Sequence, residues 1–261
     1  MRLTKVILRS VERSRRRMII AEPQSSASLP NGNVQQRRLK ESEIAVNVFV
    51  IGIAGKTGGL LARALRSHGD EVGGLVRREE QQDVLAAEGI DAVVGDLALM
   101  SSMDLASAVT DAEVVVFAAG SNGGAAEVTR TVDGDGVDKT IEAMHHVGLR
   151  RLALVSVLPE SWRERNLSDE EEYYFAVKKR ADVAVARSGL DWLILRPSLL
   201  TDDPGTGVVS LGPAELHGQI PRADVAETLA ALMHEPRIGR QILELNTGDT
   251  PIPEAVRRNI R

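Results

Sequence analysis

The sequence predicts an α/β protein built on a doubly wound parallel sheet. Residues 46–53, VNVFVIGI, form an almost wholly apolar run rich in β-branched side chains, which is typical of a strand buried on both faces. Similar apolar runs alternate with stretches of helical periodicity through the rest of the chain. This alternation is typical of a parallel sheet covered by helices, and we expect one domain with a small C-terminal substrate annex.

A glycine-rich turn follows the first strand and is the third observation. Glycines recur at three-residue spacing and lead into a helix expected from Leu60 to a stop at Gly69. Backbone N–H groups at such a turn can approach a pyrophosphate closely, with the positive end of the helix dipole behind them. The turn therefore predicts a dinucleotide site, formed by Gly52, Gly55, Lys56, Thr57 and Gly58.

The length of 261 residues suits one α/β domain with a modest annex, or two small domains. The composition is 43% hydrophobic but only 3% aromatic, so the core is expected to be Ala, Val and Leu. The chain has no cysteine, which excludes disulfides and thiolate chemistry and fits a reducing, cytoplasmic location. No apolar run is long enough for a transmembrane segment.

The first 45 residues differ in charge from the rest. They hold ten Lys/Arg and four Glu, whereas the remainder has a net charge of −11. We expect residues 1–44 to be a disordered basic arm, and residues 45–261 to be the folded domain. The arm is either a targeting segment, upstream sequence from a misassigned start, or a simple tail. The acidic body has no aromatic platform for bases, so we expect no nucleic-acid partner.

The remaining elements follow in β/α order. Strands are expected at 71–76, 92–94, 114–118, 151–157, 192–195 and 241–245. Helices are expected at 79–88, from a cap at Ser101 or Ser102 through 109, at 136–148, from 169 onward and at 223–234. His145 and His146 stand at a helix end, where solvated side chains interact well with the dipole, and we expect no metal site.

The second strand ends at Arg77 and Arg78, where an acidic residue would favour NAD. Arginines at this place suit the 2′-phosphate of NADP, and Lys56 adds another cation. NADP(H) is therefore favoured, with NAD(H) as the alternative. The third strand is closed by Gly95, Asp96 and Leu97, of which Asp96 and Leu97 are expected beside the cofactor. The small residues Ala118, Ala119 and Gly120 end the fourth strand, where a flat ring and ribose can lie against the backbone.

These motifs together resemble the short-chain dehydrogenase/reductase (SDR) superfamily in its atypical NAD(P)H-binding branch, which includes NmrA-like, Tic62-like and biliverdin-reductase-B-like proteins. The resemblance covers about residues 46–250. It rests on the order of GIAGKTG, LVRR, GDL, VFAAG, VDGDGVDKTIEA, LALVSV, YFAVKKRAD and LDWLILRPSLL. The fold it implies is Rossmann-like, in agreement with the β/α alternation.

The resemblance implies a Tyr-x-x-x-Lys pair with a serine as the chemical machinery. Tyr174 and Lys178 have this spacing on one helix face, and Ser156 ends the fifth strand. Lys178 is expected to lower the phenol pKa and to hold the nicotinamide ribose. Family members commonly have a second serine where this chain has Val157, and Ser161 is a possible substitute.

Two further features surround this pair. Ser168 and Glu171 form a capping box at the start of the helix that carries it. After the sixth strand, the resemblance makes Pro197 and Ser198 cofactor neighbours. The Gly/Pro-rich stretch at 199–220 is expected to be a mobile substrate lid.

We expect an NAD(P)H-binding oxidoreductase that reduces a small carbonyl, quinone or flavin, acting as a monomer or homodimer. The alternative is a non-catalytic NADP(H) sensor or assembly factor, favoured by Val157 and the small annex. A third possibility is an NAD-dependent sugar epimerase or dehydratase, against which Arg77 and Arg78 argue.

Overall fold

The structure is a computed structural model and describes residues 45–158, 160 and 166–261. The arm expected at residues 1–44 lies outside the described residues, and so does Ser161. Within the described part of the chain, no helix combines the length and hydrophobicity needed to span a bilayer.

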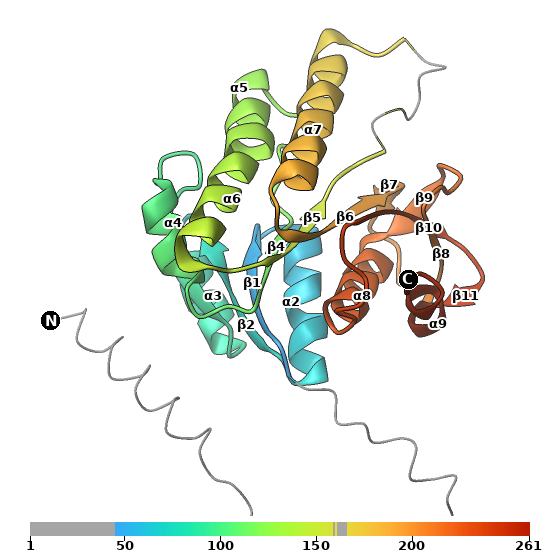
Figure 1. Ribbon diagram of the computed structural model, residues 1–261, viewed down its shortest axis with the longest axis horizontal. Coiled ribbons are helices and arrows are strands. Elements are labelled where there is room, and N and C mark those ends of the chain that lie inside the picture. Colours follow the sequence, from blue (N-terminus) through green and yellow to red (C-terminus); the bar gives the residue numbers. More distant parts are fainter. Residues whose placement is uncertain (1–44, 159, 161–165) are drawn as a thin grey trace, which may run out of the picture. The chain divides into compact units, whose positions relative to one another are not determined.

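A mostly parallel sheet is the framework of the domain (Figure 1). In the described residues it has nine strands in the order β11-β8-β10-β6-β5-β4-β1-β2-β3. All neighbours from β3 to β10 are parallel, and β8 is antiparallel to both β10 and β11. The strands are β1 (Asn47–Ile51), β2 (Glu71–Val76), β3 (Asp91–Val94), β4 (Val114–Phe117), β5 (Arg151–Val155), β6 (Asp191–Pro197), β8 (Val208–Gly212), β10 (Gln241–Thr247) and β11 (Thr250–Pro251).

Helices cover both faces of this sheet, which confirms the doubly wound, Rossmann-like prediction. Residues of α2, α3, α8 and α9 pack on one face, and residues of α4, α6 and α7 pack on the other. The helical segments are α2 (Lys56–His68), α3 (Glu79–Ala87), α4 (Ser102–Val109), α5 (Ala126–Val128), the π-helical η2 (Thr129–Gly134), α6 (Asp135–Val147), α7 (Asp169–Arg187), α8 (Arg222–Met233) and α9 (Ile252–Arg257).

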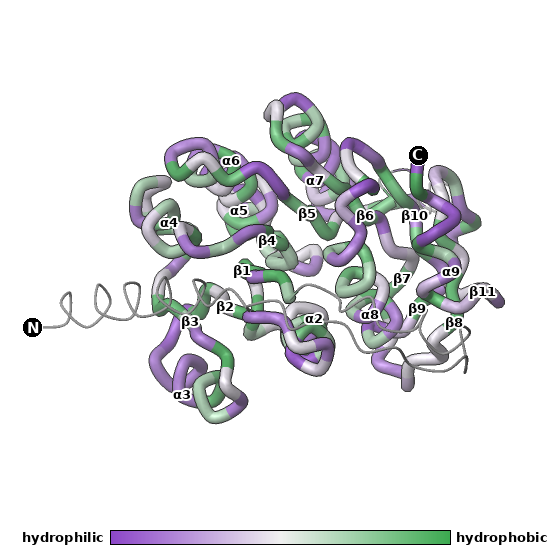
Figure 2. Tube along the Cα trace, turned by 60° about the horizontal axis from the view of Figure 1, so that its bottom comes forward, coloured by the Kyte–Doolittle hydropathy of each residue, from purple (hydrophilic) through white to green (hydrophobic). Residues whose placement is uncertain are grey.

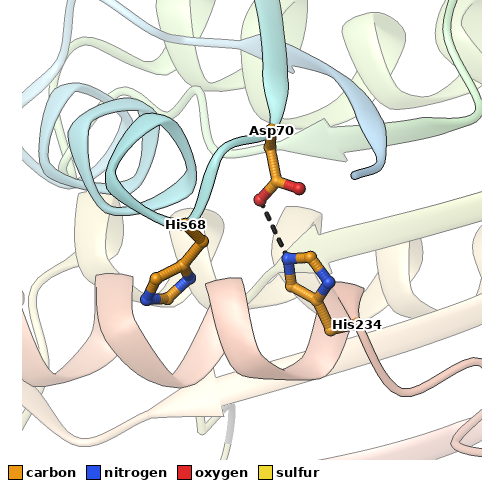
Figure 3. A group of neighbouring side chains, drawn as sticks. All are labelled: His68, Asp70 and His234. Atoms are coloured by element: carbon orange, nitrogen blue, oxygen red, sulfur yellow. Dashed lines mark hydrogen bonds and ion pairs between the residues drawn. The ribbon is translucent and has the colours of Figure 1, made fainter. Parts of the chain in front are cut away.

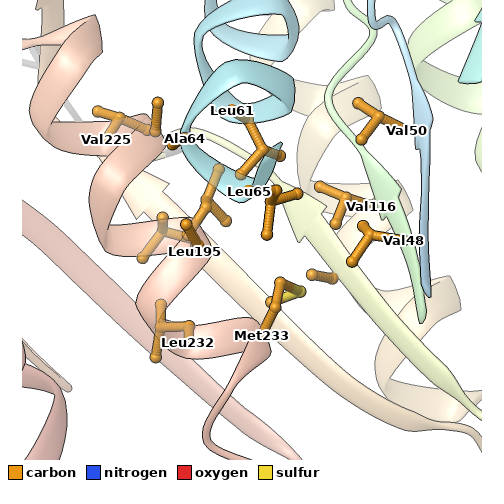
Figure 4. Packing of buried hydrophobic residues seen from close by; sticks show 14 of the residues in the cluster. Val48, Val50, Leu61, Ala64, Leu65, Val116, Leu195, Val225, Leu232 and Met233 are labelled. Carbon is orange, nitrogen blue, oxygen red and sulfur yellow. The ribbon is translucent and has the colours of Figure 1, made fainter. Parts of the chain in front are cut away.

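The apolar first strand divides its side chains between the two cores. Val48 and Val50 join the cluster with α2 and α8, which Figure 4 shows, whereas Phe49 and Ile51 join the opposite cluster. This division follows from the two-residue period of a strand. The central strands are accordingly hydrophobic along their lengths, while the covering helices alternate hydrophobic and hydrophilic stretches (Figure 2).

The glycine turn differs from the prediction in its boundaries. The strand ends at Ile51, because Gly52 has a φ of +94° and turns the chain out of the sheet. Helix α2 begins at Lys56, four residues earlier than expected, so Thr57 and Gly58 belong to its first turn. The predicted stop is confirmed, since Gly69 caps α2 in the left-handed conformation.

The segment expected to be a lid contains regular structure. It contributes β8 to the main sheet, and its β7 (Leu199–Thr201) and β9 (Gln219–Pro221) pair with each other in a small parallel sheet. Its movement over a substrate stays a prediction.

Arg151, the first residue of β5, connects the C-terminal end of α8 to the sheet through hydrogen bonds. Its guanidinium donates hydrogen bonds to the carbonyl oxygens of Leu232 (3.0 Å), Glu235 (3.0 Å) and Pro236 (3.3 Å). Arg151→Met is therefore expected to lower the free energy of unfolding by about 2 kcal/mol, because three carbonyl oxygens lose a charged donor, in two partly buried hydrogen bonds and one exposed one. Urea unfolding followed by circular dichroism measures this loss.

Arg237→Met is the matched control. Its guanidinium pairs with Glu235, but the side chain is 66% exposed against 14% for Arg151. The control is expected to cost less than about 1 kcal/mol. Equal losses in the two variants would contradict the anchoring role of Arg151.

Candidate active site

The candidate site lies where the strand order reverses. From β1 the chain builds outward through β2 and β3 on one side, and through β4, β5 and β6 on the other. Ligands of open parallel sheets bind at the carboxyl ends of the strands beside such a reversal. Here the glycine turn follows β1, and Ala118 to Gly120 follow β4.

The turn packs so closely that side chains are excluded. A Cβ atom on Gly52 would lie 2.5 Å from the Ala119 backbone nitrogen, and one on Gly58 would lie 2.2 Å from the Gly52 carbonyl oxygen. The Gly55 N–H donates to that same carbonyl, at 2.9 Å. The end of β1, the start of α2 and the end of β4 therefore meet backbone to backbone, which is the close approach that a pyrophosphate-binding turn requires.

The N-terminus of α2 is open in the sense that no side chain of its own first turn caps it or balances its positive charge. In the described part of the chain, α2 has no side-chain cap and no acidic residue in its first turn, whereas every other α-helix has an acidic residue there. The first N–H groups of a helix have no partner within the helix and carry partial positive charge. An uncompensated start of this kind fits a pyrophosphate, so the residues present suit a dinucleotide.

Three cationic side chains are predicted to bind the 2′-phosphate of NADP, and their surroundings in the structure differ. Arg77 and Arg78 are exposed after β2, and their backbone N–H groups donate to Gln81 Oε1. Within the described residues, neither guanidinium makes an ion pair, so both are available to an anion. Lys56 is different, because its ammonium pairs with Asp202 of the expected lid.

Asp202 also binds Arg222, through its second carboxylate oxygen at 2.6 Å. This double pairing holds the pKa of Asp202 below its usual range, through the Lys56 hydrogen bond first and then through the charges of Arg222 and Lys56. The sequence predicts Lys56 only as a further cation for the 2′-phosphate. In the structure it links the glycine turn to the segment after β7.

The other expected cofactor neighbours lie at the ends of their strands. Asp96 and Leu97 follow β3, and the Asp96 carboxylate accepts a hydrogen bond from the Ala98 N–H. Pro197 ends β6, and the buried Ser198 hydroxyl accepts a hydrogen bond from the Gly218 N–H at 3.3 Å.

Helix α7 positions the candidate catalytic pair. It begins with the expected capping box, in which Ser168 and Glu171 exchange hydrogen bonds, and the acidic residues of its first turn complement its dipole. Lys178 is only 3% exposed, and its Nζ donates to the Val155 carbonyl oxygen at 3.1 Å. This bond holds the ammonium at the carboxyl end of β5, directly before Ser156.

Ser156 is buried at this strand end. Its N–H donates to the Leu195 carbonyl oxygen of β6 at 2.8 Å. Within the described residues its hydroxyl makes no well-formed hydrogen bond, but it lies close enough to Asp182 to lower the pKa of that carboxyl group. A buried hydroxyl that is not fully hydrogen-bonded is a candidate for contact with a ligand.

Asp133 is a functional candidate that sequence reasoning missed. It is fully buried on the π-helical η2, where its Oδ2 accepts from the Ser121 N–H and its Oδ1 lies 3.4 Å from Lys178 Nζ. A Cβ on Gly120 would lie 3.2 Å from the same Oδ1, so the carboxylate also borders the end of β4. π-helical turns inside helices occur frequently at functional sites.

The expected effect on Tyr174 is reversed. Burial first, and then the charge of Asp133, raise the pKa of the Tyr174 phenol. From the spacing in the sequence, Lys178 is expected to lower this pKa. Because Asp133 stands beside Lys178, the negative carboxylate offsets the positive ammonium, and Tyr174 remains a neutral phenol over the physiological range.

Residues 52–236 match the model of a family described as NAD(P)H-binding. The chain belongs to this family. The matched residues run from the glycine turn to the loop after α8, so they include both the open N-terminus of α2 and the Tyr174–Lys178 pair.

Individual relatives agree with this assignment. A Bacillus subtilis (strain 168) protein named "uncharacterized sugar epimerase YhfK" is 36% identical over 215 residues, which are 82% of this chain and 100% of that protein. A Bacillus halodurans structure described as a candidate NAD-dependent epimerase/dehydratase is 32% identical, with a TM-score of 0.75 over 82% of this chain and 100% of that one.

ChuY, an anaerobillin reductase from Escherichia coli O157:H7, is 26% identical, with a TM-score of 0.65 over 78% of this chain and 98% of that one. The resemblance to atypical SDR proteins is thus confirmed, and so is NAD(P)H binding as the family property.

Sequence reasoning also missed the pairing of Asp182 with Arg196 in this SDR protein. Asp182 lies one turn after Lys178 and accepts two hydrogen bonds from Arg196, at 3.0 and 2.8 Å. Burial raises the pKa of Asp182, opposed by Ser156 and Arg196. Its place at i+4 from Lys178 was visible in the sequence, but nothing there indicated which strand it would face.

Proposed function

We propose that this atypical SDR protein is an NADPH-dependent reductase of a small carbonyl, quinone or flavin. The observation that carries the proposal is the buried Lys178, held by the Val155 carbonyl oxygen directly before Ser156. A buried ammonium is costly, and a lysine kept in this place is typical of a functional site.

The residues have distinct roles in the proposal. When bound, NADPH supplies a hydride to the substrate carbon, or to a flavin nitrogen. Tyr174 gives its phenolic proton to the substrate oxygen, which becomes negative as the hydride arrives. Ser156 donates a hydrogen bond to that oxygen, and Lys178 holds the nicotinamide ribose. The raised pKa of Tyr174 suits this direction, because only the neutral phenol donates a proton.

The relatives support different activities. The name of the Escherichia coli relative supports reduction, and the names of the two Bacillus relatives support epimerisation. Arg77 and Arg78 are exposed and make no ion pair with any other described residue, which favours a 2′-phosphate, and therefore NADPH, over the NAD held by an epimerase.

A non-catalytic NADP(H) sensor is the second candidate. One observation favours it: Asp133 lies 3.4 Å from Lys178 and also raises the pKa of Tyr174, so it weakens the influence of the ammonium on the phenol. The sensor would use the same cofactor site without transferring a hydride to a substrate.

The test is NADPH oxidation by the full-length protein, followed at 340 nm across a panel of carbonyls, quinones and flavins. Turnover of a panel member supports the reductase. Tight NADPH binding without turnover supports the sensor, and NAD that copurifies with the protein and is not consumed supports the epimerase.

The position of Arg77 at the end of β2 predicts a preference for NADPH over NADH. Arg77→Ala is expected to weaken NADPH binding by about 1 to 3 kcal/mol, the range for charge-assisted hydrogen bonds, and to leave NADH binding almost unchanged. Calorimetric titration of both cofactors measures this. Arg150→Ala is the control, because Arg150 is an exposed arginine at the amino end of β5, on the edge of the sheet opposite to Arg77. Equal losses for NADPH and NADH would contradict a 2′-phosphate contact.

A further inference from the structure

Two histidines and an aspartate meet at the amino edge of the sheet. His68 is the last residue of α2, Asp70 directly precedes β2, and His234 directly follows α8. Arg77 lies at the other end of β2, so this cluster and the candidate active site are at opposite edges of the sheet. Three separate elements supply the three side chains, and α2 packs against α8 (Figure 4).

The side chains can present one donor atom each to a common point. One nitrogen from each imidazole and one Asp70 oxygen all lie within 4.8 Å of one another. His234 Nε2 is already 2.9 Å from Asp70 Oδ2. Figure 3 shows the carboxylate directed between the two rings, whose centroids are 6.0 Å apart.

The carboxylate is oriented by the fold. Asp70 is fully buried, and its Oδ1 accepts a hydrogen bond from the Val46 N–H at 3.0 Å. This bond leaves Oδ2 directed toward the histidines. Hydrogen bonds of this kind commonly orient metal-ligating carboxylates. A buried carboxylate is also costly without positive charge nearby, and a metal ion supplies that charge.

We propose that His68, Asp70 and His234 bind a divalent first-row transition-metal ion, with Zn²⁺ as the expected ion. Two imidazoles and one carboxylate are a common zinc donor set, with distances of about 2.0 to 2.2 Å. The donor atoms must close in from their present separation, and the His68 side chain, 35% exposed, has the freedom to move.

Glu227 lies beside His68 but outside the group of three, so water is expected to complete the coordination. The Glu227 Oε2 lies 3.9 Å from His68 Nε2, and Glu227 precedes His234 by seven residues, about two turns of α8. A carboxylate here would balance the charge left by Zn²⁺ and Asp70. The ion would tie α8 to α2 and β2, so its role is structural and separate from the reaction at the opposite edge.

The experiment titrates the full-length, untagged protein with ZnCl₂ after treatment with a chelator. We expect one equivalent of zinc per chain after dialysis, and at saturation a melting temperature higher by about 5 °C. Co²⁺ in place of zinc should give the visible absorption of a tetrahedral site. NADPH affinity should stay the same with and without zinc.

His68→Gln is the decisive variant, because this exposed residue can change without disturbing the core. It is expected to lose the zinc equivalent and the thermal shift, whereas His145→Gln, an exposed histidine at the end of α6, should keep both. Zinc uptake that is absent in the unaltered protein, or equally retained by both variants, would overturn the proposal. His234→Gln provides the second check, since it should abolish the Co²⁺ absorption while the circular dichroism spectrum shows that the fold is kept.

Discussion

Tyr174→Phe is expected to lower the turnover of a carbonyl substrate by about 10² to 10⁴, with NADPH affinity unchanged. The substitution removes the proton donor and keeps the ring, which packs edge-on against Phe175 at 5.7 Å between centroids. The loss should appear in kcat, because the proton is needed only as negative charge develops on the substrate oxygen. Steady-state kinetics on the best substrate of the panel measure it.

Tyr173→Phe is the matched control. Tyr173 is the only other tyrosine of the chain, and it is exposed on the same helix, one residue earlier. Its substitution should leave turnover unchanged. If Tyr174→Phe also has no effect, Tyr174 is not the proton donor, and any reduction depends on proximity alone. A flavin substrate is not suited to this comparison, because hydride transfer to a flavin need not use a protein acid.

The raised pKa of Tyr174 predicts how the rate of reduction depends on pH. Because burial and Asp133 raise the pKa of Tyr174 above its usual value near 10, the phenol keeps its proton through the neutral and mildly alkaline range. Reduction should therefore show no loss from this group up to about pH 10. Oxidation of the product alcohol needs the phenolate and should stay slow over the same range.

Gly52→Ala is expected to destabilise the domain by about 2 to 5 kcal/mol and to abolish NADPH binding. Part of the cost is the left-handed conformation, about 1 to 2 kcal/mol for a residue with a Cβ. The rest is overpacking, because the new Cβ would lie 2.5 Å from the Ala119 nitrogen and must push the glycine turn away from β4.

Gly69→Ala separates these two contributions. Gly69 has almost the same φ, +93° against +94°, but nothing lies within 4 Å of a Cβ there. It should therefore cost only about 1 to 2 kcal/mol and leave NADPH binding intact. Urea unfolding and cofactor titration of both variants provide the measurement. Equal losses of stability and affinity would show that the contact between Gly52 and Ala119 has no special role.

Sequence patterns predicted much of the candidate site because its parts are local. The glycine turn, the arginines at the end of β2 and the Tyr174–Lys178 spacing each occupy a few consecutive residues. Helical and strand periodicity then determine which of them face the same way. The capping box of α7 was predictable for the same reason, since both partners lie within four residues.

Long-range pairings were not predictable in this way. Lys56 appeared as a free cation, but Asp202 pairs with it from a segment 146 residues later. Asp133 appeared as a residue preceding a helix, but η2 buries it beside Lys178, 45 residues further along the chain. Charge and hydropathy patterns contain no information about such partners. The expected direction of the Tyr174 pKa was wrong because it considered only the neighbour on the same helix.

The sequence by itself determined the alternation of the main strands and helices, the doubly wound sheet and the place of the glycine turn in the chain, because periodicity and glycine spacing are short-range physical constraints. The tertiary structure alone decided which charges meet. It paired Asp133 with Lys178 and Asp202 with Lys56, and it brought His68, Asp70 and His234 to one edge. The reason is that electrostatic and metal-ligand interactions depend on distances of a few ångströms in space, and only the packing of α2, α7 and α8 on the sheet sets those distances.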